Sequence, residues 1–198
     1  MPRLLAACGG FLLGVLCMDL AFDLQVLAHG ASAAPVAEDA LASIAAYYAR
    51  VTDDTNPGRH LIGAVMIATL GGSLYQLLRR RSQRALHGLA LLLSGVPIGL
   101  AMLRVLPNAA ALGTRADSAA VQAALARSIC WDHIFCFAAI AAFIALQLRV
   151  ACDHGNALRS EPQAGEARAK RAAAERSSSG QAADGRAQRG AAERSRKD

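Results

Sequence analysis

Two aspartates inside the apolar N-terminal segment constrain this chain more than any other feature. The segment Leu4–Leu27 begins with an uncharged run, Leu4–Met18, of only 15 residues. A helix needs about 20 apolar residues to cross the hydrocarbon core of a bilayer. A spanning helix must therefore continue through Asp19 towards Asp23, and these two side chains, one turn apart, share a face of that helix.

Carboxylates at this depth need a partner or a wet cavity, because each costs about 2.5–3.5 kcal/mol on membrane-insertion scales. Two main roles are open: ion pairs with arginines of neighbouring helices, or a site for a proton, an ion or a substrate. Exposure at the level of the lipid headgroups is a third alternative. On the opposite face, Gly10 and Gly14 form a small-xxx-small pair that allows close helix contact and a homo-oligomer.

The same segment has some features of a cleaved signal peptide. Arg3 precedes the apolar run, and Ala31-Ser32-Ala33 resembles a cleavage site. However, the run is long for a signal peptide, and two acids inside it fit poorly. We therefore favour a first segment that is retained as a span.

Three further hydrophobic stretches predict an all-α protein, a bundle of four transmembrane helices. The spans are expected at about residues 4–27, 61–78, 87–103 and 129–148. Pro97 lies near the middle of the third span and should kink it. An extramembrane stretch is expected from 109 to 127, with a helix that starts near Asp117 or Ser118. The membrane domain should cover residues 1–152.

A shorter amphipathic helix is predicted over residues 38–51, between the first two spans. Leu41, Ile44 and Tyr48 recur at helical spacing, and Tyr47 lies beside them. The segment is too polar and too short to span a bilayer. We expect it along the membrane surface or over the end of the bundle, with its tyrosines at headgroup level.

Residues 153–198 predict a disordered basic tail. Leu158 is the only large aliphatic residue in this stretch, so it cannot bury enough apolar surface to fold alone. The five cysteines include no C-x-x-C pair, which gives no sign of a redox or zinc motif. We expect no cofactor, no bound metal and no nucleic-acid partner.

The distribution of arginine predicts the orientation of the chain. The N-terminus and the connection between the second and third spans carry Arg3, Arg79, Arg80, Arg81 and Arg84 without an acid. The opposite side is rich in acids. The positive-inside rule then puts both termini in the cytoplasm. The alanine- and arginine-rich composition suits a GC-rich bacterial genome, and we expect the protein in the inner membrane.

This topology gathers the charged residues of the spans into one layer on the outer side. The candidate site residues in it are Asp19, Asp23, Arg59, His60, Arg104, Asp132 and His133. We expect Arg104 to pair with Asp19, with Asp132 competing for the same guanidinium or taking Arg59. Because these arginines disfavour a cation, an anionic small ligand or lipid fits the layer better than a divalent metal.

The function predicted from these residues is that of a non-enzymatic, multi-pass membrane protein that binds a ligand or a partner at the outer polar layer. The rival is a small membrane enzyme or transporter in which Asp19 or Asp23 handles protons. The sequence contains no P-loop, Rossmann glycine motif or H-E-x-x-H pattern.

Overall fold

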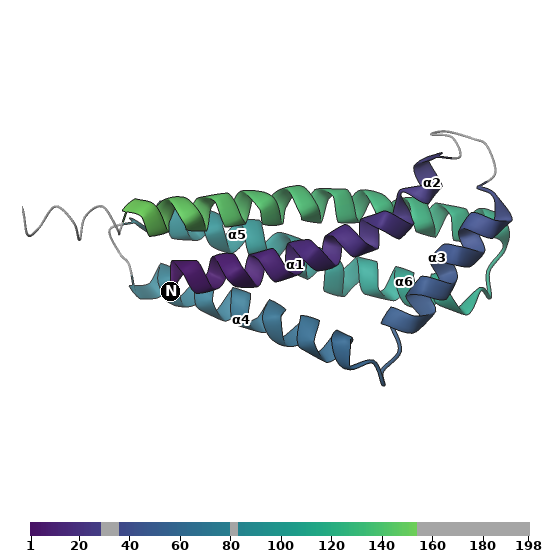
Figure 1. The fold of residues 1–198 in the computed structure, drawn as a ribbon, viewed down its shortest axis with the longest axis horizontal. Coiled ribbons are helices and arrows are strands. Elements are labelled where there is room, and N and C mark those ends of the chain that lie inside the picture. Colours follow the sequence, from purple (N-terminus) through teal and green to yellow (C-terminus); the bar gives the residue numbers. More distant parts are fainter. Residues whose placement is uncertain (29–35, 80–82, 154–198) are drawn as a thin grey trace, which may run out of the picture. The chain divides into compact units, whose positions relative to one another are not determined.

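The computed structural model describes residues 1–28, 36–79 and 83–153, and every regular element in these ranges is a helix (Figure 1). The chain divides into two units, Met1–Ala151 and Cys152–Asp198. All that follows concerns the first unit and the helix that ends just beyond it. The predicted tail after Asp153, the Ala31-Ser32-Ala33 sequence and two of the arginines before the third span lie outside the described residues.

The first span runs through both aspartates, as predicted. Helix α1 (Pro2–Asp23) is followed after a single residue by α2 (Gln25–Ala28). The apolar helix Pro2–Leu27 is long enough to cross a bilayer. Asp23 therefore ends α1 and does not lie in a loop.

Helices pack closely at Gly9 and Gly72, and not at Gly10 or Gly14. A Cβ atom added to Gly9 would lie 2.8 Å from Cγ1 of Ile144, and one added to Gly72 would lie 2.7 Å from Cδ2 of Leu5. By contrast, a Cβ at Gly10 or Gly14 would have no neighbouring atom within 4 Å. The close contacts of α1 inside the bundle thus use the other face of the helix.

The predicted amphipathic helix is present with the predicted bounds, as α3 (Glu38–Val51). The acids in its first turn, Glu38 and Asp39, interact favourably with the positive end of the helix dipole. The connection that follows leads into α4 (Pro57–Arg79), whose first residue is proline, a residue common at the start of helices. Asn56 caps α4, since its Oδ1 accepts a hydrogen bond of 2.9 Å from the Gly58 amide.

The third span is longer than predicted. It comprises α5 (Arg84–Leu100), a π-helical segment η2 (Ala101–Val105) and α6 (Leu106–Thr114) in one continuous helix. The last helix, Ala119–Asp153, starts directly after Ser118. Most of the stretch from 109 to 127, expected between spans, is therefore helical. Only a short turn interrupts it, where Arg115 adopts a left-handed conformation with φ 54°.

In the part of the chain that the structure describes, four helices are long and apolar enough to cross a membrane, which supports a multi-pass membrane protein. α3 packs against α6 across one end of the bundle (Figure 1). Its buried face, which includes Leu41, Ile44 and Tyr48, forms a hydrophobic core with residues of α6 and of the last helix.

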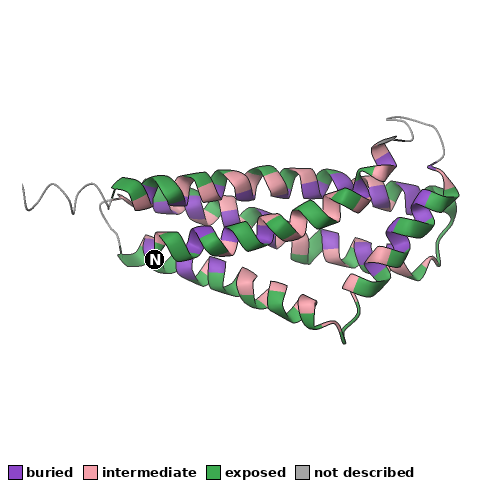
Figure 2. Ribbon diagram, in the orientation of Figure 1, coloured by how far each residue is buried: buried purple, intermediate pink, exposed green. Residues whose placement is uncertain are grey.

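Burial along α4 is uneven (Figure 2). All the buried residues of this helix, Thr69, Gly72, Ser73 and Gln76, lie in its C-terminal half. The N-terminal half diverges from α1 towards α3 (Figure 1). This half of α4 lines a cavity that also includes Asp19 in its lining.

Candidate functional site

A fully buried carboxylate lies at the centre of the polar layer. Asp23, at the end of α1, has 0% exposure. Its Oδ1 accepts a hydrogen bond of 2.6 Å from the hydroxyl of Tyr48, and its Oδ2 lies 2.6 Å from Nδ1 of His133. With Asp23 ionised, and therefore able only to accept hydrogen bonds, Nδ1 is the donor in this contact. Two donors from two other helices thus fix this side chain.

Asp19, one turn earlier in α1, has a second and looser set of contacts. Its Oδ1 accepts a hydrogen bond of 2.6 Å from the hydroxyl of Tyr47. Its Oδ2 lies 3.9 Å from Nε2 of His133, which is beyond hydrogen-bonding distance. The Tyr47 ring is held in place by stacking on Phe22, with ring centroids 4.2 Å apart. The imidazole therefore stands between the two aspartates and directly bonds only one of them.

The two tyrosines are neutral donors to these carboxylates. Burial, together with the negative charge and the hydrogen bond of the neighbouring aspartate, raises the pKa of Tyr47 and the pKa of Tyr48 above the ordinary tyrosine value. Both hydroxyls stay protonated at neutral pH and keep donating. The stabilisation they give the fold is complete below about pH 10 and is lost as pH rises through these raised values.

The predicted pairing of Asp19 with Arg104 is wrong. Nε of Arg104 lies 3.1 Å from Oδ2 of Asp132, and Nη2 donates a hydrogen bond of 3.0 Å to Oγ of Ser128. Ser128 and Asp132 are one turn apart on the last helix, and Arg104 lies on η2, which faces that helix. The alternative prediction, in which Asp132 takes Arg104, is the one found.

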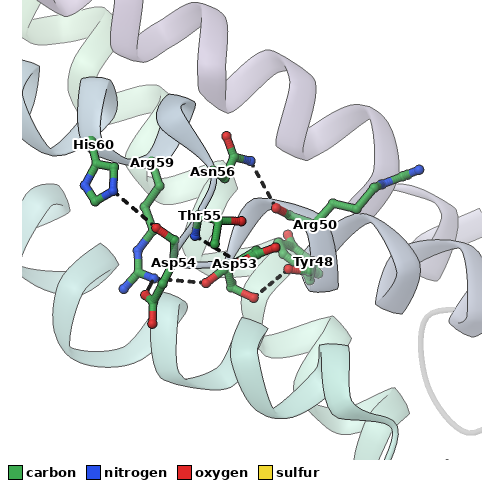
Figure 3. Close-up of polar contacts among 9 residues, drawn as sticks. Tyr48, Arg50, Asp53, Asp54, Thr55, Asn56, Arg59 and His60 are labelled. Carbon is green, nitrogen blue, oxygen red and sulfur yellow. Dashed lines mark hydrogen bonds and ion pairs between the residues drawn. The ribbon is translucent and has the colours of Figure 1, made fainter.

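Arg59 and His60 belong to a separate group at the turn between α3 and α4 (Figure 3). Arg59 forms an ion pair with Asp54 and donates a hydrogen bond of 3.0 Å to the carbonyl of Thr52. Nε2 of His60 lies 3.2 Å from the Asp54 carbonyl oxygen. The predicted layer therefore divides. Arg104 and Asp132 form a separate ion pair, and two groups remain: His133 with Asp19 and Asp23 inside the bundle, and these residues at the turn.

A cavity of about 620 Å³ joins the two groups. Apolar side chains of α1, α4, α5 and the last helix line most of it, among them Leu12, Leu16, Ile62, Met66, Ile98 and Ile140. Asp19, Tyr47 and His133 line its polar end, together with Arg59 and His60. Ile67 on α4 and Met102 on η2 also line it and are 74% and 53% exposed, so the cavity opens sideways between these helices.

The site has the general character of a binding pocket for a small molecule. Such pockets have volumes of about 300–1,000 Å³, mostly apolar walls and a few convergent polar groups. Among the described residues, no three His, Cys, Asp or Glu side chains are arranged to hold a metal ion. The chemistry that the polar end offers is hydrogen bonding and proton exchange at Asp19 and His133.

The sequence identified the acids and His133 but missed the roles of Tyr47 and Tyr48. Both tyrosines were assigned to the headgroup region, because amphipathic rings are common there. One signal could have revealed this role. The tyrosines lie on the apolar face of a short helix that must pack against the bundle, and the acids in the first span need hydrogen-bond donors. Comparisons with known protein families, with curated proteins and with solved structures find no match for this chain.

Proposed function

We propose that this protein binds an amphipathic small molecule that enters from the lipid phase. The observation that carries the proposal is the continuity of the cavity, whose apolar walls end at Asp19, Tyr47 and His133. An apolar tail would lie along α4 and α5, and a polar head would reach the aspartate. The exposed rim at Ile67 and Met102 provides the route of entry.

The proposal includes a location in the inner membrane of a bacterium, with both termini in the cytoplasm. The orientation is supported by the asymmetry of charge. The start of α1, the end of α4 and the start of α5 lie remote from α3 (Figure 1), and these helix ends carry Arg3, Arg79 and Arg84, while acids are frequent around α3. The binding residues then belong to the outer half of the bilayer. The open face at Gly10 and Gly14 is available for contact with a second copy of the chain.

A rival function is that of a small membrane enzyme or transporter in which Asp19 or Asp23 handles protons. The position of His133 between the two carboxylates favours it. Replacing Asp23 by Asn retains the size of the side chain and removes its charge. Proton handling gains support if activity in cells is lost while folded protein stays abundant, and a structural role gains support if abundance falls.

Two matched glycine substitutions in α4 test the binding function. Gly63 lines the cavity and Gly71 does not, and a Cβ added at either position meets no atom within 4 Å. We expect Gly63→Phe to fill the cavity and Gly71→Phe to leave it open, with similar effects on the helix itself.

The measurement is native mass spectrometry of small molecules that stay bound when the protein is extracted from its membrane. The wild-type protein and Gly71→Phe should retain a bound amphiphile, and Gly63→Phe should lose most of it. Equal retention by all three proteins, or by none, would refute the proposed binding site.

A further inference from the structure

We infer that the polar end of the cavity exchanges a proton for the head of a lipophilic amine. In this exchange, an ammonium group binds between Asp19 and His133, and the proton on Nε2 of His133 leaves to solvent. The inference rests on the proposed binding function and specifies its ligand class. It is argued from the charges and distances around His133.

The first step is the hydrogen-bonding state of His133. Its Nδ1–H is engaged with Asp23 at 2.6 Å, so Nε2 of the neutral ring has only a lone pair to offer. The atom that faces it, Oδ2 of Asp19, is also an acceptor, at 3.9 Å. A donor placed between these two acceptors would satisfy both. A proton on Nε2 or a donor group of a ligand can supply it.

The second step is the sign of the charge. With both aspartates ionised, two negative charges stand against at most one positive charge on the imidazole. Arg104 and Arg59, expected to attract an anion, are paired with Asp132 and Asp54. The side chain of His133 is only 6% exposed and that of Asp19 14%, so water screens this charge little. A cationic head is therefore complementary to the site, and an anionic head is not.

The third step is the balance of the exchange. Before binding, an imidazolium stands between the two carboxylates. After binding, the ammonium donates one N–H to Asp19 and another to Nε2, while Nδ1–H stays on Asp23. One proton has left and one cation has entered, so the charge of the buried site is unchanged. The amine's apolar chain occupies the cavity between α4 and α5.

The titratable and charged groups around His133 and along the cavity come from several elements. Asp19, Asp23 and Asp132 act on the imidazole directly. The others are Tyr47 and Tyr48 from α3, Cys130 and Cys136 from its own helix, Arg104, which pairs with Asp132, and Asp54, Arg59 and His60 at the turn end of the cavity. Only histidine among these side-chain types has an ordinary pKa between pH 5 and 8. His60 lies at the turn, where its Nε2 approaches the Asp54 carbonyl. Substituting each histidine separately therefore shows which of the two releases the proton and causes the pH dependence of binding.

Three probes with the same chain and different heads test the inference: dodecylammonium, dodecanol and dodecanoate. The full-length protein is placed in phosphatidylcholine nanodiscs, and binding is measured by isothermal titration calorimetry, with empty nanodiscs as the blank. Titrations in buffers of different ionisation enthalpy give the number of protons released. We expect dodecylammonium to bind best and to release up to one proton at low pH. Because protons compete with the ammonium group, the affinity of dodecylammonium should fall as pH is lowered. The fall should approach about tenfold per pH unit once the imidazole is protonated before binding.

Two substitutions identify the groups responsible. Asp19→Asn keeps an acceptor for Tyr47 but removes the charge, and it should weaken dodecylammonium binding by about 10- to 100-fold while changing dodecanol binding little. His133→Asn keeps a donor towards Asp23 and should abolish proton release and the pH dependence. His60→Asn removes the other imidazole of the cavity, so proton release that persists in this variant belongs to His133.

The results separate the two proposals. If dodecanol binds as well as dodecylammonium, if dodecanoate binds best, or if no proton is released between pH 5 and 8, the exchange is refuted. The binding function then still stands, provided that Gly63→Phe blocks whichever probe binds. If no probe binds and Gly63→Phe retains as much native amphiphile as Gly71→Phe, both proposals fail.

Discussion

The side chain of Asp23 illustrates how single residues hold this site together. A carboxylate with no exposure is tolerated only because donors replace the water it has lost. Tyr48 and His133 provide those donors from two different helices, each at 2.6 Å. The same contacts that stabilise the charge therefore also dock α3 and the last helix against α1.

We predict that Tyr48→Phe lowers the free energy of unfolding by about 1.5–3 kcal/mol, the usual contribution of a hydrogen bond to a charged group. Tyr75→Phe is the matched control. The Tyr75 ring is 49% exposed and contacts the guanidinium of Arg79, which the phenyl ring also allows. Unfolding by sodium dodecyl sulfate in mixed micelles, followed by circular dichroism, measures both variants. Equal stability of the two would contradict the assigned role of Tyr48.

Sequence reasoning located the charged residues of the site but assigned some of their partners wrongly. Asp19, Asp23 and His133 were placed in one layer because charges inside spans are rare and their depth follows from the topology. Arg104 was given to Asp19 because depth says nothing about the direction in which a side chain points. The π-helical turn that directs Arg104 to Asp132 has no signature in the sequence.

At the scale of elements, α3 was predicted with its bounds because strong local signals mark both ends. Acids open it, and a turn rich in Asp, Asn and Gly follows it. The end of the third span lacked such signals. Residues 106–114 contain proline and asparagine and lie beyond the predicted end of the third span at 103, but they form α6 and pack against α3. The contact with α3 stabilises a helix in this segment, although its local sequence does not clearly favour one.

Gly113 sets the distance between α3 and α6. A Cβ at this position would lie 3.0 Å from the amide nitrogen of Ala49 and 3.1 Å from its Cα, both backbone atoms that cannot rotate away. We predict that Gly113→Ala destabilises the docking of α3 by about 1–3 kcal/mol. Hydrogen exchange of the α3 amides should accelerate accordingly.

Gly99→Ala is the control for this substitution, because a Cβ there meets no atom within 4 Å. It should be neutral or stabilise the third span by up to about 1 kcal/mol through helix propensity. Faster exchange in α3 for both variants would mean that the effect does not arise from the contact with Ala49.

At the scale of the whole molecule, the proposed orientation predicts the side of each connection. Reporter fusions at residue 84 and at the C-terminus should both report the cytoplasm, and a reporter inserted in the turn at 53–56 should report the opposite side. The physical reason is the retention of arginine on the cytoplasmic side during insertion. A cytoplasmic signal from the turn, or an external one from either fusion, would overturn the orientation.

The contact between Asp23 and His133 also has a consequence for biosynthesis. The two residues are 110 positions apart in the chain. At about 5–20 residues per second, a ribosome needs roughly 5 to 20 seconds to reach His133 after it has added Asp23. During that interval the first helix carries an acid without its final partner. The nascent protein must therefore delay the full burial of this segment, or shield it by other means, until the last helix arrives.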